Sequence, residues 1–470
     1  MISILYSFLF AASITLINPW GPILFLSETG RGETWTLPKV LAIVVITTLN
    51  LILLVKKKME EKNLKLCITL NDKVWLGLWL AFLLSATVST LLSPFSLYSL
   101  LGHPVLGDGL LYWILVFTFT VSNAFIIRLE PRIFHAQLRG ILAGGSVVGV
   151  SIIPQLLDWR IDYTILSGQV SFFDEQLLES SIWKDQMPIG LFSNRGHASF
   201  VLASSICLGF AAIASQWLVS RFWKMACLLM FFSLLGTQTL AGILSCIIGT
   251  IYLFFQHFPS IVEQALSRRL QRKRVLYFMA VVSALVLLVF FSLNYREYSA
   301  MSREKSMYAF LESIVTGRLY LWSLALKGVA QRPIFGWGLD GFGIAHLFVG
   351  DWNERLNSHI PDGTYVTQIL NIYEYTFDFL STDNNVYSGL AFSQKAHTLF
   401  LDLTLSIGIL GASLYLGLTG YSFWRLSKSK FKLLCVVVLV YLVFTQAWFE
   451  SAQYTHISWW CLSLGFSTKR

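Results

Sequence analysis

The stretch KAHTLFLDLTLSIGILGASLYLGLTGYSFW, residues 395–424, decides the class of fold. From Thr398 to Trp424 it is apolar for long enough to cross a membrane, since a helix needs about 20 such residues for a hydrocarbon core of about 30 Å. Lys395 and His397 stand directly before this predicted span, and Asp402 lies inside it. An ionisable residue within a membrane helix is a functional candidate by default. The stretch therefore predicts both a membrane protein and a site at one end of its helix.

Composition extends this interpretation to the whole chain of 470 residues. Hydrophobic residues make up 55% and charged residues 13%, whereas soluble domains carry about 25% charged residues. About twelve segments satisfy the length rule for a span. They are Ile2–Ile17, Leu37–Val55, Val74–Leu92, Leu110–Ile127, Leu138–Leu157, Ala198–Ser215, Met225–Gly236, Leu240–Phe255, Val275–Leu293, Thr398–Trp424, Leu433–Phe449 and Ile457–Phe466.

The basic residues set the orientation of these spans. With twelve spans, the basic loops around 56–58, 128–139, 221–224, 268–274 and 425–432 all fall on one side, which the positive-inside rule makes cytoplasmic. The net charge of +9 needs no nucleic acid, because anionic membrane lipids suffice as partners. We predict an all-α integral membrane protein of three regions. They are residues 1–294 with about nine spans, a large external loop at 295–396 containing short interfacial helices, and C-terminal membrane helices at 397–470.

The external loop contains a segment with helical periodicity, Thr316 to Pro333. Arg318 would stand in its first turn, where free backbone N–H groups attract anions and a planar guanidinium binds phosphate oxygens bidentately. The alternative is an arginine that reaches lipid phosphates, with Trp322 in the headgroup layer. The turn PIFGWGLDGFG follows, residues 333–343, and no strand precedes its Gly-x-Gly as a dinucleotide site would require. The polar residues 351–394 could order around a glycan or form a lid.

Metal ligation is not predicted. Six of the eight histidines fall on the external side, yet none has HExxH or similar spacing, and no CxxC occurs. We expect no metal and no cofactor.

The order of these elements resembles a known family. An Arg-x-x-x-Trp helix (Arg318, Trp322), a Pro-x-x-Gly-x-Gly turn, and His397 before a span that contains Gly408 and Gly411 follow one another. Earlier, residues 93–111 contain a Ser-Leu-x-Gly element, and residues 190–203 contain Gly-x-x-x-Asn-x-x-x-Ala. This combination resembles the O-antigen ligase and Wzy polymerase superfamily of multi-pass membrane glycosyltransferases.

The resemblance implies a fold similar to the GT-C class and an active site on the outer face of the bacterial cytoplasmic membrane. Members transfer a glycan from undecaprenyl diphosphate to an acceptor hydroxyl on a glycan or lipid-linked acceptor, without metal. The family's functional histidine corresponds to His397 and its helix arginine to Arg318. A second diphosphate-binding arginine would be Arg195 or Arg160, and Arg195 is preferred because it lies at a helix entrance. The chain departs from the family in having Thr398 where Asn is common, Leu106 where an arginine is common, and Arg195 where a proline is common.

The chemistry fits these residue types. Histidine, with an unperturbed pKa near 6.5, can take the acceptor proton as the bond forms, and arginines can stabilise the departing diphosphate. Direct displacement would invert the anomeric carbon and needs no paired carboxylates. Asp402 is a poorly placed orienter for His397, five residues away, and Lys395 would either assist the diphosphate or be a plain interfacial lysine.

Two alternatives stay open. The chain could be a Wzy-type polymerase rather than a ligase, since the sequence does not name the acceptor. A non-enzymatic transporter of polyisoprenoid-linked glycans is the rival from another class. Transporters line a path through the membrane midplane with polar residues, whereas ionisable residues here gather at the external boundary.

Overall fold

The computed structural model describes residues 2–18, 32–60, 68–103, 106–156, 188–257, 318–349, 366–372, 376–390 and 395–467. The first half contains α1 (Ile2–Thr15), η1 (Gly32–Thr36), α2 (Leu37–Glu60), α3 (Leu70–Leu91), α4 (Ser96–Leu101), α5 (Leu110–Leu129), α6 (Arg132–Leu156), α7 (Arg195–Ala214), α8 (Arg221–Gly236) and α9 (Leu240–His257). The second half contains α13 (Arg318–Gln331), α14 (Gly341–Val349), β1 (Val366–Ile372), β2 (Thr376–Ser381), β3 (Val386–Leu390), α15 (Leu399–Ser427), η5 (Lys432–Leu434), α16 (Cys435–Phe444), α17 (Thr455–Ser463) and η6 (Leu464–Phe466).

The described part of the chain is mostly helical and suits a multi-pass membrane protein. Six of its helices are long and apolar enough to cross a membrane: Thr34–Glu60, Leu70–Leu91, Leu110–Leu129, Arg132–Leu156, Arg195–Ala214 and Leu399–Ser427. Shorter apolar helices run over Ile2–Thr15, Leu240–Gln256 and Lys432–Phe444. The predicted span Val275–Leu293 lies outside the described residues, so the count of twelve stays a prediction.

Two of the predicted spans have different boundaries in the structure. The predicted span Leu433–Phe449 ends as a helix at Phe444, and the chain then turns through residues 445–454. The predicted span Ile457–Phe466 is the pair α17 and η6, which is buried throughout. These two segments are short because they pack inside the bundle, where no lipid thickness fixes their length.

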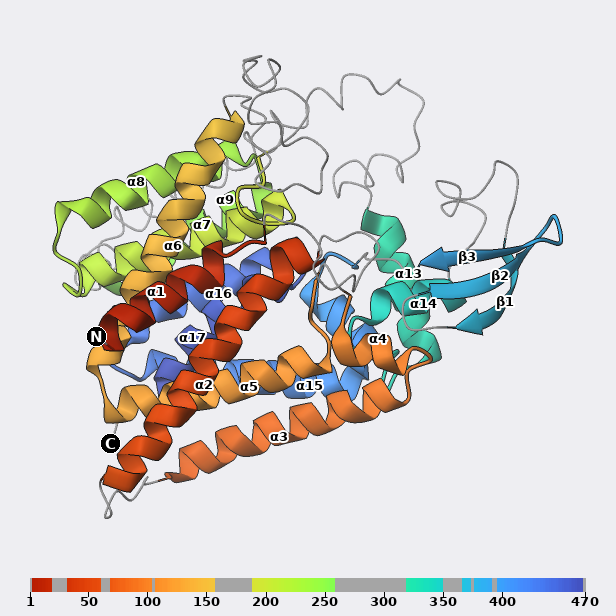
Figure 1. Ribbon diagram of the computed structural model, residues 1–470, viewed down its shortest axis with the longest axis horizontal. Coiled ribbons are helices and arrows are strands. Elements are labelled where there is room, and N and C mark those ends of the chain that lie inside the picture. The colour runs from red at the N-terminus through yellow and green to blue at the C-terminus, as the bar shows by residue number, and fades with distance from the viewer. Residues whose placement is uncertain are drawn as a thin grey trace, which may run out of the picture.

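The helices form one bundle with the small elements α13, α14 and the sheet at one end (Figure 1). Helix α1 packs on α2 and α6, α3 packs on α15, and α7 packs on α8, α9 and α16. Helix α7 is the most enclosed of the six long apolar helices, with 83% of its apolar window buried. Its many Ala, Ser and Gly residues let neighbouring helices approach closely.

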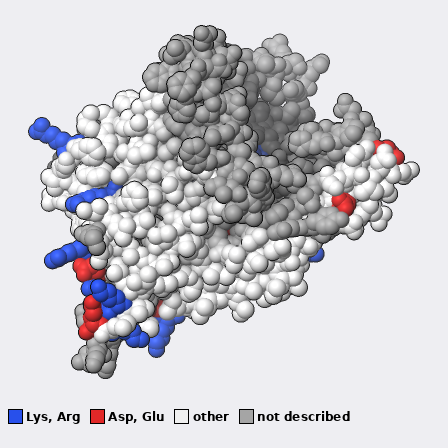
Figure 2. Space-filling view, viewed as in Figure 1, with Lys and Arg blue, Asp and Glu red and all other residues white. Residues whose placement is uncertain are grey.

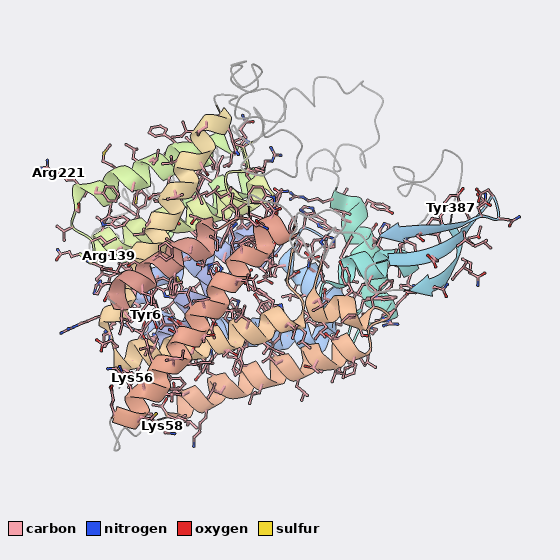
Figure 3. All side chains as sticks on the ribbon, viewed as in Figure 1. Tyr6, Lys56, Lys58, Arg139, Arg221 and Tyr387 are labelled. Atoms are coloured by element: carbon pink, nitrogen blue, oxygen red, sulfur yellow. The ribbon has the colours of Figure 1, made fainter. Side chains whose placement is uncertain are left out.

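Basic residues gather at the opposite end of the bundle. Lys56, Lys58, Arg139 and Arg221 lie along the same edge of the molecule in Figure 3, and Figure 2 shows Lys and Arg concentrated there. At this end Arg128 forms a bidentate ion pair with Asp72, with N–O distances of 2.8 and 3.1 Å. The positive-inside rule predicts that such a basic end faces the cytoplasm, and this orientation stays a prediction.

Helix α15 is broken at Gly408, and the predicted Gly-rich turn is inserted at the break. Gly408 has φ +70° and ψ 177°, a conformation essentially restricted to glycine. The N–H of Ile409 donates to Pro333 O at 2.8 Å, while Trp337 N and Gly338 N donate to the carbonyls of Leu405 and Ser406 at 3.0 and 2.8 Å. Backbone groups in a membrane must be satisfied within the protein, so the turn supplies the partners that the broken helix lost.

We expect Gly408→Ala to destabilise the protein. A Cβ at Gly408 would overlap the Ile334 carbonyl, and the backbone conformation alone costs a non-glycine residue about 1–3 kcal/mol. The midpoint of thermal unfolding in detergent should fall, whereas Gly417→Ala in the same helix, where a Cβ meets nothing within 4 Å, should leave it unchanged or raise it. Equal midpoints for Gly408→Ala and the wild type would contradict the role of this break.

The prediction of an all-α protein misses a three-stranded antiparallel sheet of order β1-β2-β3. It lies within the polar segment 351–394, with Phe377 opposite Gly389 and Phe379 opposite Tyr387. Phe377 and Phe379 are both buried. Because they are two residues apart, their side chains lie on the same face of the strand. That face packs on the cluster that includes Leu321 of α13 and Phe342 of α14.

Candidate functional site

His397 lies at the head of α15 in an unusual backbone conformation. Its φ is +57°, a left-handed value that few residues other than glycine adopt. The imidazole contacts the rings of Trp448 and Phe449 edge-on, with centroid distances of 5.3 and 4.9 Å. Among the described residues, its buried Nδ1 has no hydrogen-bond partner. One ring nitrogen of His397 is therefore not engaged by the described part of the protein.

Arg318 begins α13 and faces the same tryptophan. Its guanidinium carbon lies 5.8 Å from the centre of the Trp448 ring, within the range of a cation–π contact. The predicted helix over Thr316–Pro333 agrees with α13, although Thr316 lies outside the described residues.

Arg195 begins α7, and this helix end also abuts Trp448. Asn194 caps the helix by accepting a hydrogen bond from Gly196 N at 2.8 Å. A Cβ at Gly196 would overlap the indole ring, so only glycine lets the helix approach so closely. The Nη1 of Arg195 is buried and has no hydrogen-bond partner in the described part of the chain.

Trp448 thus lies beside two predicted site residues and one helix end. His397 and Arg318 lie close to its ring, and Gly196, which follows Arg195 at the start of α7, lies against it. The indole Nε1 of Trp448 is itself buried, and none of the residues that the structure describes forms a hydrogen bond with it. Sequence reasoning missed this residue because it placed Trp448 in the last turn of a span. The doublet Trp448-Phe449 at the end of that predicted span was the available signal, since such aromatics mark membrane boundaries.

Trp322 and Asp402 hold the peptide that precedes His397. Trp322 Nε1 donates to Ala396 O at 2.9 Å, and Ala396 N donates to Asp402 Oδ1 at 2.7 Å. Asp402 therefore accepts a hydrogen bond from the backbone of this turn, while its buried Oδ2 has no hydrogen-bond partner within the described ranges. Trp322 joins α13, which carries Arg318, to the turn that carries His397.

Lys395 has a different environment from the one predicted for it. Its Nζ lies 2.7 Å from Asp108 Oδ2 and 2.7 Å from Asp340 Oδ1, and the side chain is 5% exposed. The ammonium of Lys395 is therefore already paired with two carboxylates, whereas the predicted role has it assisting a diphosphate. Arg160, the other predicted arginine, lies outside the described residues.

The electrostatics of the site favour a neutral imidazole. Burial, together with the positive charge of Arg318, lowers the pKa of His397 to about 4. Burial would also lower the pKa of Lys395, but Asp108 and Asp340 outweigh it and the pKa is raised. At neutral pH the site therefore combines an uncharged histidine with two arginines.

This arrangement can accept a proton and bind an anion at one place. A neutral imidazole with a free nitrogen is a base, and two arginines with a helix N-terminus attract negative charge. Among the described residues, no group of three or more His, Cys, Asp and Glu side chains is arranged to hold a metal ion.

Comparison with known proteins gives a match to one family model. No curated protein matches the chain. The family model described as O-antigen ligase matches residues 225–416, a range that contains Arg318, the Gly-rich turn and His397 but neither Arg195 nor Trp448. This match confirms the resemblance of the chain to the O-antigen ligase and Wzy polymerase superfamily.

Proposed function

We propose that the protein transfers a glycan from undecaprenyl diphosphate to an acceptor hydroxyl, at the outer face of the bacterial cytoplasmic membrane. The family is associated with membrane glycosyltransferases of the ligase or polymerase type. The carrier lipid, the inverting course, the metal independence and the roles of single residues are part of our proposal.

One observation carries the proposal. A histidine with an unpartnered nitrogen, a helix-starting arginine, and the N-terminus of a second arginine-bearing helix all meet one indole ring. His397 lies two residues before α15, Arg318 begins α13 and Arg195 begins α7, and these three elements are far apart in the sequence. Such a convergence of a base with anion-binding groups supports transfer from an anionic leaving group.

The chemical roles follow from the two kinds of group. His397 takes the proton of the acceptor hydroxyl while that oxygen attacks the anomeric carbon. The bond from the anomeric carbon to the diphosphate breaks, and Arg318 and Arg195 stabilise the charge that collects on the phosphate oxygens. Because the acceptor attacks opposite the leaving group, the anomeric configuration inverts without a covalent glycosyl-enzyme.

The test is transfer in proteoliposomes. Purified protein, undecaprenyl-diphosphate glycan and a set of acceptors would be incubated with EDTA, and the glycosylated products would be identified by mass spectrometry. Transfer to a lipid-linked core sugar supports a ligase, and extension of the carrier-linked glycan itself supports a polymerase. Movement of the donor across the bilayer without any glycan transfer would overturn the proposed enzymatic function and favour a transporter.

Gly196→Ala should impair this transfer. The added methyl would push Trp448 from its place against α7, and displacement of groups around a reacting centre by about 1 Å can cost on the order of 10²-fold in rate. We expect kcat/KM per folded protein to fall by about 10- to 100-fold, and the overlap should also lower the thermal midpoint, because overpacking costs about 1–3 kcal/mol. Gly420→Ala, where a Cβ meets nothing within 4 Å, is the matched control, and equal rates for both variants would exclude a role for the indole position.

A further inference from the structure

Three external segments meet at one buried lysine. Asp108 precedes α5, Asp340 precedes α14, and Lys395 stands two residues before His397. The Lys395 ammonium lies 2.7 Å from each carboxylate, and the three side chains are 5%, 7% and 2% exposed for Lys395, Asp108 and Asp340. The contact between Lys395 and Asp108 joins residues 287 positions apart. These two ion pairs link the three segments, and both are buried away from solvent.

The aspartates are themselves held in place. Asp340 has φ +57° and accepts a hydrogen bond from His103 N at 2.7 Å through the oxygen that Lys395 does not contact. The loop of Asp108 is tied to the chain beyond Trp448, because Ala452 N donates to Leu106 O at 2.8 Å. Lys395 therefore connects the His397 turn to both the α14 turn and the segment that carries Trp448.

His397 needs such restraints. A non-glycine residue at positive φ persists only where its surroundings over-determine it. The peptide of Ala396 is held by Trp322 and Asp402, and Leu399 N donates to Thr445 O at 2.7 Å. These bonds fix the chain just before and just after His397. The ion pairs of Lys395 fix the position of the chain where it enters this turn, two residues before His397.

Lys395 is not free to bind a ligand. Burial and the charge of Asp340 raise the pKa of Asp108 to about 6, although Lys395 opposes the rise. Lys395 thus faces two buried carboxylates, and moving its ammonium to a diphosphate would leave both without their cation. Removing a buried charge from its partners is strongly unfavourable.

We propose that Lys395, with Asp108 and Asp340, is a positioning group that sets the backbone of His397 against Trp448, and is not a diphosphate ligand. The proposal rests on the proposed function only for the kinetic part of its test. It replaces the ligand role that the sequence indicated for Lys395 with a structural role in aligning the base.

The kinetic test compares Lys395→Met with Lys57→Met. Lys57 pairs with Glu130 at 3.1 Å at the basic end of the bundle, so its variant makes the same change away from the site. For Lys395→Met we expect kcat to fall by at least about tenfold while the donor KM stays within about twofold. Lys395→Arg, which keeps a cation able to bridge two carboxylates, should restore most of kcat. A donor KM that rises in proportion to the loss in kcat/KM would overturn the proposal and make Lys395 a diphosphate ligand.

A second readout does not depend on transfer. Diethyl pyrocarbonate modifies neutral imidazoles, and mass spectrometry gives the rate at each histidine. The rate at His397 should change several-fold in Lys395→Met and in the milder variant Asp108→Asn, while the rate at exposed His135 stays constant. Unchanged rates at His397 in both variants would overturn the positioning role. If the wild type transfers no glycan, the proposed function fails, and this readout still decides the positioning role.

Discussion

Replacing His397 with alanine is expected to lower the rate of glycan transfer by about 10²–10⁴-fold, the range that a positioned general base contributes. The variant loses an imidazole that is uncharged at neutral pH and whose Nδ1 has no partner among the described residues. The donor KM should change little, because Arg318 and Arg195 keep their positions. Transfer rates and donor affinities in proteoliposomes measure both quantities.

Two controls make the result specific. His135→Ala removes an exposed histidine from α6 near Arg139, and its activity should equal that of the wild type. His397→Gln keeps a polar side chain of similar reach but no base, and it should be as inactive as the alanine variant. An active glutamine variant would show that His397 serves by hydrogen bonding and not by taking a proton.

The pH dependence follows from the same residue. Since burial, then Arg318, lowers the pKa of His397 to about 4, kcat/KM should be flat near neutral pH and fall as the pH drops through about 4. Stability carries the same sign. Between a pKa of about 6.5 in the unfolded chain and about 4 in the fold, the unfolded state binds more protons, so this histidine costs stability as the pH falls through that window.

Much of the bundle could be predicted from the sequence, because hydropathy is a local property of each segment. The predicted span Leu110–Ile127 corresponds to α5, and Ala198–Ser215 corresponds to α7 with a shift of its start. The break at Gly408 could not be seen this way, because the residues on both sides are apolar. Its cause is the insertion of the turn at residues 333–338, which lies far away in the sequence.

Some residues of the candidate site could likewise be predicted from the sequence, and others could not. His397 and Arg318 could be chosen from residue type, helix position and family resemblance, and the structure brings both to one ring. Trp448 and the partners of Lys395 could not be chosen, because they depend on contacts between distant segments. The sheet was not predicted because its alternating pattern is short, and because Phe377 and Phe379 lie in a segment, residues 351–394, that is polar overall.

Arg318→Ala is expected to lower kcat/KM by about 10²–10³-fold, the effect of removing one preorganised charge-stabilising group. Part of the loss should fall on the donor KM, because in the proposed mechanism the guanidinium contacts the phosphate oxygens both before and during bond cleavage. Arg318→Lys should recover only part of the activity, since a single ammonium cannot reproduce bidentate binding.

Arg332→Ala is the matched control for this arginine. Arg332 also stacks on a tryptophan, with its guanidinium carbon 4.3 Å from the centre of the Trp337 ring, and it donates to Leu92 O at 3.0 Å. Arg332 directly follows the other end of α13. Its variant therefore removes a cation–π contact of the same kind, but one that does not involve Trp448. Near wild-type transfer in Arg332→Ala, beside the loss in Arg318→Ala, would assign the effect to the position of the charge.

The arginine variant should also change the acid limb of the pH profile. The charge of Arg318 contributes to the low pKa of His397, so its removal raises that pKa toward the ordinary value near 6.5. The residual kcat/KM of Arg318→Ala should therefore begin to fall at a higher pH than that of the wild type. A bound diphosphate offsets the same positive charge. In the wild type, kcat should therefore begin to fall at a higher pH than kcat/KM, because kcat/KM reports the pKa of the free enzyme. An acid limb that stays in place in Arg318→Ala would mean that the two side chains do not share one electrostatic site.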